Sequence, residues 1–325
     1  MTETQNLKPN PPNPPILKGG EGGFMIFMVC GRQTRHVKFV SDWSLTDASS
    51  DIRIYGFKGH QARRYQMEDQ LTQVARWIVT SKKVIVFSGA GLSTESGIPD
   101  FRTPGGVWDR YNPEDFYFQN FIASETSREK YWQLATEMWE PIKMAKPNQA
   151  HLAVAELEKL GRLDCVITQN IDGLHFRAGN SEEKVIQLHG TSLFVSCLSC
   201  QKRYDRDAIQ ERVKKGQKVP RCDDCGGILK PATVSFGQSM PEKETQEAYH
   251  RSSLCNLFIV VGSSLVVQPA ASMPLVAKRS GARLVIINRD PTPCDDMADV
   301  VIHGQAGPTM ANILEHVKRE LRVGI

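Results

Sequence analysis

The stretch from Val84 to Arg102 constrains the fold of this chain more than any other. An apolar, β-branched run, Val84 to Phe87, ends in Gly89-Ala90-Gly91 and is followed by small hydroxyl residues. This pattern is typical of a buried parallel strand that feeds a phosphate-binding turn. Glycines let the backbone approach a pyrophosphate, and the following helix directs free N–H groups at its charge. A Gly-x-Gly turn alone is weak evidence, but the segment Ser96 to Arg102 adds an acid, an aromatic ring and a guanidinium.

Further apolar runs alternate with segments of helical length. We expect strands at 164–168, 185–188, 257–261, 284–287 and 300–302. We expect helices from about residue 67, at 127–140 ending before Pro141, at 148–160, at 270–280 and at 309–321. In the helix at 148–160, Leu152, Ala155 and Leu157 are predicted to face inward. Alternation of this kind predicts an α/β fold, a parallel sheet with helices on both faces.

Polar and glycine residues follow five of the expected strands, at 88–91, 169–172, 189–190, 262–264 and 288–290. The carboxyl ends of parallel strands share one edge of a sheet, so these residues are predicted to surround one crevice. His189, with Gly190 after it, is well placed to act as a general base near neutral pH, although a lone histidine is more often structural. Taken alone, Asn170 and Asp172 are better explained as part of a polar loop that caps the next helix.

Four of the eight cysteines form two Cys-x-x-Cys pairs, Cys197/Cys200 and Cys222/Cys225. This spacing predicts a tetrahedral zinc site, and four thiolates leave no open position, so the zinc is expected to be structural. The segment 201–221 between the pairs holds eight Lys or Arg and three acids. Zinc ribbons often bind nucleic acid, but a solvated basic face is the commoner explanation of such a cluster.

The remaining composition excludes several classes of protein. The net charge of +4 gives no general case for nucleic acid, and no apolar stretch approaches the ~20 residues that span a bilayer. No secretory leader is recognisable, and the scattered single cysteines suit a reducing cytoplasm. Residues 1–23, rich in proline and glycine, are expected to be disordered, and 24–65 show no sustained periodicity.

Several motifs occur in the same order as in the sirtuin family, the NAD-dependent protein deacylases. The chain resembles a bacterial-type member of this family. The motifs are Gly89-Ala90-Gly91-x-Ser93-x-x-Ser96-Gly97-Ile98-Pro99-Asp100-Phe101-Arg102, Thr168-Gln169-Asn170-Ile171-Asp172, His189-Gly190, the two cysteine pairs, Gly262-Ser263-Ser264-Leu265-x-Val267-x-Pro269 and Ile287-Asn288-Arg289. Together they span roughly residues 67–320.

The resemblance implies a Rossmann-like large domain with a small zinc-ribbon module inserted at about 192–229. It implies that 66–325 form the catalytic domain and that 1–65 are an extension. NAD as co-substrate and an acyl-lysine peptide or protein would enter the cleft between domain and module. The reaction implied is the removal of acyl groups, acetyl first of all, from protein lysines. The acyl oxygen attacks the ribose C1′ and expels nicotinamide, and the product is O-acyl-ADP-ribose.

Roles for individual residues also follow from the resemblance. His189 would be the general base on the nicotinamide ribose, which Asn170 and Asp172 orient and Gln169 helps to hold. Ser93, Arg102 and Ser263 would contact phosphates. Asn288 and Arg289 would meet the adenosine ribose, and Ala306 the adenine. The implied cofactor site is completed by Gly89, Ala90, Gly91, Asp100, Phe101, Gly262 and Ser264.

The chain departs from the family after the second cysteine pair, where Ala232, Ser235 and Gln238 replace two acids and an aromatic residue. Val234 and Phe236 are still expected to line an acyl-lysine tunnel together with Phe101. The helix at 127–140 lacks the Tyr-x-x-Arg pattern of members that select succinyl groups, so an uncharged acyl group is favoured. Alternative functions are mono-ADP-ribosyl transfer or NAD hydrolysis in the same cleft, and a nucleic-acid adaptor with a vestigial nucleotide fold.

Overall fold

The computed structural model describes residues 59–101 and 105–323, with side chains from residue 65 onward. The expectations for residues 1–23, and the site residue Arg102, lie outside the described residues. The chain divides into two units, Met1–Met67 and Glu68–Ile325. Every described strand belongs to the second unit.

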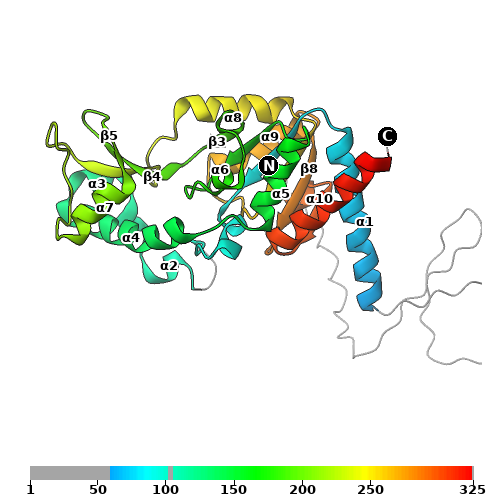
Figure 1. Cartoon of the computed structure of the whole chain (residues 1–325), viewed down its shortest axis with the longest axis horizontal. Helices are drawn as coiled ribbons and strands as arrows, with labels where there is room; N and C mark the ends of the chain where they lie inside the picture. The colour runs from blue at the N-terminus through cyan, green and yellow to red at the C-terminus, as the bar shows by residue number, and fades with distance from the viewer. Residues whose placement is uncertain (1–58, 102–104, 324–325) are drawn as a thin grey trace, which may run out of the picture. The chain divides into compact units, whose positions relative to one another are not determined.

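A six-stranded parallel sheet forms the centre of this unit, with strand order β3-β2-β1-β7-β8-β9. Figure 1 labels two of its strands, β3 and β8. The six strands are β1 Val84–Ser88, β2 Cys165–Thr168, β3 Val185–Gln187, β7 Leu257–Val261, β8 Arg283–Asn288 and β9 Val300–His303. The order reverses between β1 and β7, which is where doubly wound sheets bind their ligands. The expected α/β fold with a Rossmann-like sheet is confirmed.

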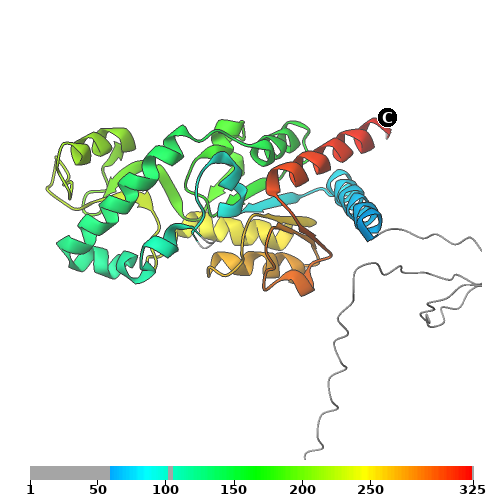
Figure 2. The ribbon, with the colours of Figure 1, turned by 90° about the horizontal axis from the view of Figure 1, so that it is seen from below.

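Alternate residues of each strand serve two separate hydrophobic layers. Val84 and Val86 of β1 face a layer closed by α1 (Gly59–Thr80), α5 (Gln149–Lys159) and α10 (Ala306–Val323). Ile85 and Phe87 face the opposite layer, closed by α8 (Glu242–Leu254) and α9 (Met273–Arg279). Figure 2 shows α8 and α9 on one side of the sheet, with α5 and α10 on the other. Because both faces are covered, the strands read as continuous apolar runs.

Two sequence-based expectations about helices are wrong. Helix α4, Glu125–Met144, does not end before Pro141 but continues through it, because Trp139, Ile142 and the following Ala145 are buried. Packing thus outweighs the backbone hydrogen bond that a proline removes. In α5, Leu152 is 53% exposed and faces outward, since the buried stripe runs through Ala150, Ala153, Val154 and Leu157.

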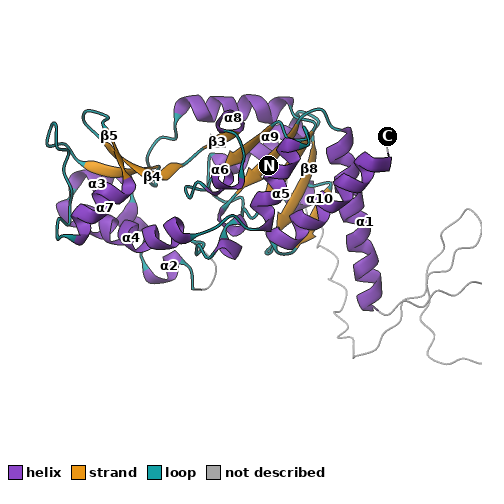
Figure 3. Ribbon diagram, viewed as in Figure 1, coloured by secondary structure: helices purple, strands orange, loops and turns teal. Residues whose placement is uncertain are grey.

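A second, three-stranded antiparallel sheet lies apart from the first, in the order β5-β4-β6 (Figure 3). It is formed by β4 Gly190–Cys197, β5 Arg203–Asp205 and β6 Leu229–Thr233, with α7 Arg206–Lys214 between the last two. Helices α2 Val107–Arg110 and α3 Phe118–Ala123 belong to the segment that leads into α4, and α6 Leu174–Ala178 follows β2. We refer to β4, β5, α7, β6 and their loops as the cysteine module.

None of the helices in the described part of the chain is both long and apolar enough to cross a membrane.

Candidate functional site

One cavity of about 710 Å³ lies at the carboxyl ends of the parallel strands. Residues after β1, β2, β3, β7 and β8 all line it, so the five strand ends predicted from the sequence do surround one crevice. The cavity continues past this edge to α4 and the cysteine module. Its lining includes every described residue of the predicted cofactor and acyl sites: Gly89, Ala90, Gly91, Ser93, Asp100, Phe101, Gln169, Asn170, Asp172, His189, Val234, Phe236, Gly262, Ser263, Ser264, Asn288, Arg289 and Ala306.

At the switch between β1 and β7 the two glycine loops lie in direct contact. The Gly91 N–H donates to the Gly262 carbonyl at 2.8 Å, and the Gly89 N–H donates to Val261 at 3.1 Å. Gly262 has φ +63°, and a Cβ there would lie 2.1 Å from the Leu92 nitrogen. Only glycine allows this close approach of two backbones.

The expectation of a helix directly after the first glycine loop is wrong. Two short 3₁₀ turns, Ala90–Leu92 and Thr94–Ser96, follow β1 instead. The Gly89 N–H is already bound to Val261 at the end of β7, and the Gly91 N–H to Gly262 in the loop after it. This segment therefore lines the cavity with small residues and backbone atoms, and it does not form the N-terminus of an α-helix.

His189 follows β3 with its ring at the cavity surface. Its Nδ1 lies 3.0 Å from the Gln169 carbonyl oxygen, which can only accept, so Nδ1 carries the proton and Nε2 keeps its lone pair. Burial lowers the pKa of His189, and the hydrogen bond to Gln169 opposes this. Gly190, next in the chain, has φ +68°, and a Cβ there would lie 2.1 Å from the Ala232 carbonyl oxygen. The ring is thus held in one orientation beside a fixed backbone, with Nε2 unprotonated.

Asn170 and Asp172, which follow β2, converge on one hydroxyl group from the loop after β1. Ser93 Oγ donates to Asp172 Oδ2 at 2.7 Å and accepts from Asn170 Nδ2 at 3.0 Å. All three residues are buried. Asp172 Oδ1 also accepts from the Leu174 N–H at 2.8 Å, so the carboxylate caps α6 while its other oxygen binds Ser93. Asp172 therefore binds the backbone at the start of α6 and also lines the cavity.

Two buried histidines lie behind these residues and were not predicted as part of the site. His151 Nε2 is 3.5 Å from Ser93 Oγ, and His175 Nε2 is 2.9 Å from Ser88 Oγ. Their rings pack edge to face with centroids 5.2 Å apart. Burial lowers the pKa of His151 to about 2 and that of His175 to about 4. Both rings are therefore neutral at physiological pH and position the hydroxyl groups in front of them.

The far end of the crevice is lined by the loops after β2, β7, β8 and β9. Gln169 Nε2 donates to Ser263 Oγ at 2.8 Å, which links the loops after β2 and β7. Asn288 Nδ2 donates to the Asp290 carbonyl at 2.7 Å, and Arg289 lies next to Asp290. Ala306 opens α10, where the Gly307 N–H donates to the Glu95 carboxylate at 2.8 Å.

Two of the three residues predicted to line an acyl tunnel, Phe101 and Phe236, belong to an aromatic cluster. Trp108 contacts both Phe101 and Phe236, with ring centroids 5.4 and 5.9 Å apart. The Val234 N–H donates to the His189 carbonyl at 2.9 Å, so this wall is fixed beside the histidine. Ser235, where the family has an aromatic residue, donates to Tyr131 Oη at 3.2 Å.

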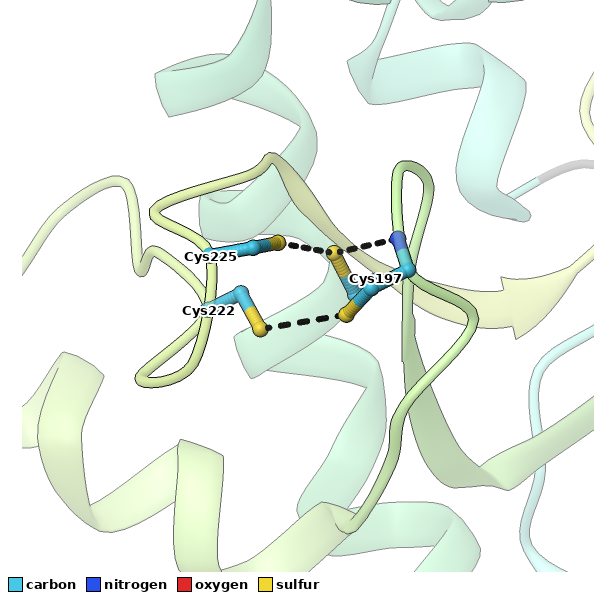
Figure 4. A group of neighbouring side chains, drawn as sticks. Cys197, Cys222 and Cys225 are labelled. Atoms are coloured by element: carbon cyan, nitrogen blue, oxygen red, sulfur yellow. Dashed lines mark hydrogen bonds between the residues drawn. The ribbon is translucent and has the colours of Figure 1, made fainter.

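The four cysteine sulfurs of the module all lie within 4.8 Å of one another. Cys197 Sγ is 3.5 Å from Cys225 Sγ, and Cys200 Sγ is 3.6 Å from Cys222 Sγ. Figure 4 shows the sulfurs turned toward one another from two facing loops. Four thiolates at 2.3 Å from one zinc ion would be separated by roughly 3.8 Å, so the residues fit a closed tetrahedral site.

The basic segment between the cysteine pairs is largely committed to ion pairs. The pairs are Lys202–Asp224, Arg212–Asp223, Lys214–Glu140, Lys218–Glu129 and Arg221–Glu125. Three of these acids belong to α4, so much of the charge joins the module to that helix. Arg206 is different, because it is only 1% exposed and lies inside the protein. No periodic pattern in the sequence distinguishes it from its solvated neighbours.

Comparison with known proteins agrees with this geometry. Residues 89–269 match the model of the Sir2 family. An NAD-dependent protein deacetylase 1 from Bradyrhizobium diazoefficiens is 47% identical over 72% of this chain and 91% of the relative. An NAD-dependent protein deacylase 2 from Archaeoglobus fulgidus is 43% identical over 78% of this chain and 98% of the relative.

Solved structures give the same result. A structure described as bearing on the mechanism and regulation of Sir2 enzymes superposes with a TM-score of 0.71, at 43% identity, over 78% of this chain and 99% of that chain. A complex of Sir2 with a p53 peptide and NAD+ superposes with a TM-score of 0.67, at 38% identity, over 78% and 97% of the two chains.

Proposed function

The chain belongs to the Sir2 family and is an NAD-dependent protein-lysine deacylase, and we propose that its acid–base step runs through His189. The observation that carries this assignment is the hydrogen bond from His189 Nδ1 to the Gln169 carbonyl. It leaves the unprotonated Nε2 for a ribose hydroxyl. NAD supplies the ribose carbon that accepts the acyl oxygen when nicotinamide leaves, and O-acyl-ADP-ribose is the expected product.

The polar network beside His189 supports a positioning role for Asn170 and Asp172. Their side chains are fixed by Ser93, which the neutral His151 ring approaches from behind. Preorganised side chains of this kind contribute to rate by holding a substrate in its reacting geometry. We assign the nicotinamide ribose to this end of the cavity. We assign the phosphates to Gly89, Ala90, Gly91 and Ser263, with Arg102 from outside the described residues.

The opposite end of the crevice suits the adenosine half of NAD. Asn288 ends β8 and Arg289 follows it, so both lie at the edge of the sheet where a ligand of such a fold binds. Ala306 and its neighbouring glycines supply a small, flat surface for a base. The acyl-lysine is assigned to the channel between Phe101, Val234 and Phe236, whose far end lies against α4.

The proposal also covers the bounds of the catalytic domain and the cellular compartment of the protein. We take residues 66–325 as the catalytic domain and 1–65 as an extension, in line with the second unit, Glu68–Ile325. We also propose a cytoplasmic location, since a four-cysteine metal site and buried single thiols such as Cys165 and Cys255 suit a reducing compartment. Burial raises the pKa of Cys165 and of Cys255 to about 12, which suits inert core residues.

The test is product analysis with one acetylated peptide, comparing the wild type with His189→Ala. We expect wild type to form nicotinamide, free lysine peptide and O-acetyl-ADP-ribose in equal amounts. His189→Ala should lose about 10²–10⁴-fold in deacylation rate while it still binds NAD. Exchange of labelled nicotinamide should fall less, because expulsion of nicotinamide precedes the base-dependent step.

Two outcomes would contradict the proposal. Free ADP-ribose or ADP-ribosylated protein, in place of O-acetyl-ADP-ribose, would favour NAD hydrolysis or mono-ADP-ribosyl transfer in the same cleft. A His189→Ala protein that deacylates at the wild-type rate would remove His189 from the acid–base step.

A further inference from the structure

The two cysteine pairs of the metal site have different hydrogen-bond donors. Cys197 Sγ, in the first pair, accepts from the backbone N–H groups of Ser199 at 3.4 Å and Cys200 at 3.5 Å. Cys222 Sγ, in the second pair, lies 3.1 Å from the phenol oxygen of Tyr204. Within the described part of the chain, Tyr204 is the one residue other than a cysteine whose side chain hydrogen-bonds to a sulfur of the site.

The direction of the hydrogen bond between Tyr204 and Cys222 follows from a third group. The Asp223 N–H donates to Tyr204 Oη at 3.0 Å, and a backbone N–H can only donate. This bond uses a lone pair of the phenol oxygen and leaves the phenol proton free for Cys222 Sγ. A cysteine that binds zinc does so as a thiolate, which can only accept. The phenol therefore donates to the sulfur.

The sulfur of Cys222 needs such a donor because water has little access to it. Cys222 is only 4% exposed, whereas Cys200 and Cys225 are exposed. A buried charged group has to be paired or hydrogen-bonded by the protein itself. The two residues that follow it in the loop, Asp223 and Asp224, are acids and offer no side-chain proton to a thiolate. Tyr204 supplies the proton that these neighbours lack.

Tyr204 also joins the two halves of the metal site. It lies in β5 and pairs with Val195 of β4, the strand that ends at Cys197 of the first pair. Its ring packs against the hydrophobic cluster that contains Val195 and Cys197. From there the hydroxyl reaches both the Cys222 sulfur and the Asp223 N–H in the loop that faces Cys197 (Figure 4). One hydroxyl therefore connects the strand after the first pair to the loop of the second pair.

We propose that Tyr204 is part of the zinc site, and that its hydroxyl holds the Cys222 thiolate in its ligand position and slows the release of the metal. A sulfur that is already oriented needs less ordering when it binds a metal ion. Hydrogen bonds to metal ligands act in this way elsewhere, and the loss of one typically lowers metal affinity about 10- to 100-fold. The inference goes beyond the acid–base role of His189 and does not depend on it.

The experiment compares the wild type with Tyr204→Phe, both as full-length, zinc-loaded protein. Phenylalanine keeps the ring, its packing and its contact with Lys202, whose Nζ lies 5.2 Å from the ring centroid, and removes only the hydroxyl. Competition with a chromogenic chelator measures the zinc affinity, and an excess of the chelator measures the rate of zinc release. We expect the affinity of Tyr204→Phe to fall about 10- to 100-fold and its zinc to be released faster.

A second measurement reports on the hydrogen bond itself. Cobalt(II) can occupy a tetrahedral thiolate site in place of zinc, and the thiolates then give a sulfur-to-metal charge-transfer absorption. A thiolate that loses a hydrogen bond gives up electron density more easily. This absorption should therefore move to longer wavelength in Tyr204→Phe, whereas a general loosening of the module would not shift it.

Tyr249→Phe is the matched control, because it removes a phenol that hydrogen-bonds to Ser272 in the sheet domain, at 2.7 Å. It should match the wild type in zinc affinity and in the cobalt spectrum. Either an unchanged zinc affinity or an unshifted cobalt absorption in Tyr204→Phe overturns the proposal. So does a Tyr204→Phe module that is cut by protease even at saturating zinc, because Tyr204 would then support the fold of the module and not the metal.

Discussion

The parallel sheet and the cysteine module of this protein are stabilised in different ways. Two continuous hydrophobic layers cover the faces of the sheet, and they draw residues from all of its strands. The hydrophobic cluster at the module holds five buried residues of the module, Val195, Cys197, Ile209, Cys222 and Leu229, together with Trp132 of α4, and two of these are cysteines of the metal site. A core this small does not sustain a fold alone, so the module depends on its metal.

The two regions also differ in how their buried polar groups find hydrogen-bond partners. Behind the strand ends, the side chains of Ser93, Asn170 and Asp172 hydrogen-bond to one another and are held in place without a ligand. At the α4–α7 interface, Arg206 Nη1, Trp132 Nε1 and Gln210 Nε2 have no partner among the residues that the structure describes. The polar side chains behind the strand ends are therefore held by one another, whereas this interface leaves buried donors without a protein acceptor.

The largest effect is expected from removing the metal, which should unfold the module and leave the sheet domain folded. Cys222→Ala should release zinc and unfold the module, because the binding free energy of such a site, roughly 10 kcal/mol or more, is also folding energy. Metal analysis and limited proteolysis would follow the loss, and far-UV circular dichroism should show that most helices of the sheet domain remain.

Cys255→Ala provides the control, since Cys255 is buried in the sheet layer and far in sequence from the metal site. It should retain a full complement of zinc and resist protease. Pure, active wild-type protein without zinc would refute the dependence of the module on metal.

The same contrast explains what the sequence could predict. Strand β7 was expected at 257–261 and lies there, and β1 was placed within one residue, because strands buried on both faces leave unbroken apolar runs. The convergence of five strand ends follows from the parallel topology alone. Likewise the cysteine spacing is enough to predict the metal site.

Other features depend on packing that no local pattern records. Helix α8 was missed because only Ala248 and Ser252 of its thirteen residues are buried, so it shows no apolar period. His151 looks like a helix-cap neighbour of Asn148, and only the fold places its ring behind Ser93. In the sequence Arg206 resembles the basic residues around it, and only the fold shows that it is buried against α4.

An effect of intermediate size is expected in the sheet domain when the pH is lowered. An unfolded chain protonates His151 and His175 near pH 6.5, whereas the folded protein does not protonate them until about pH 2 and about pH 4. Between pH 6.5 and 4 the unfolded state thus binds more protons, and stability falls with decreasing pH. The slope should be about 1.4 kcal/mol per pH unit for each histidine.

Urea unfolding between pH 7 and pH 5, with zinc kept in the buffer, would measure this slope. His175→Gln should flatten it, and His250→Gln should not, because His250 is exposed on α8. Equal slopes in wild type and His175→Gln would show that the buried pair is not the source of acid sensitivity.

The smallest expected effect concerns the ion pairs on the outside of the module. Lys214 Nζ lies 2.9 Å from Glu140 Oε1 and joins α7 to α4, but both side chains are about half exposed. Solvent and salt screen such a pair, and ordering two long side chains offsets its attraction. Lys214→Ala should therefore leave the thermal midpoint unchanged within error in low and in high salt, just as Lys215→Ala should at the exposed neighbouring position. A fall of several degrees in low salt alone would mean that surface charge holds the module against α4. The buried contacts of Trp132, Trp139 and Arg206 would then contribute less to that interface than the structure indicates.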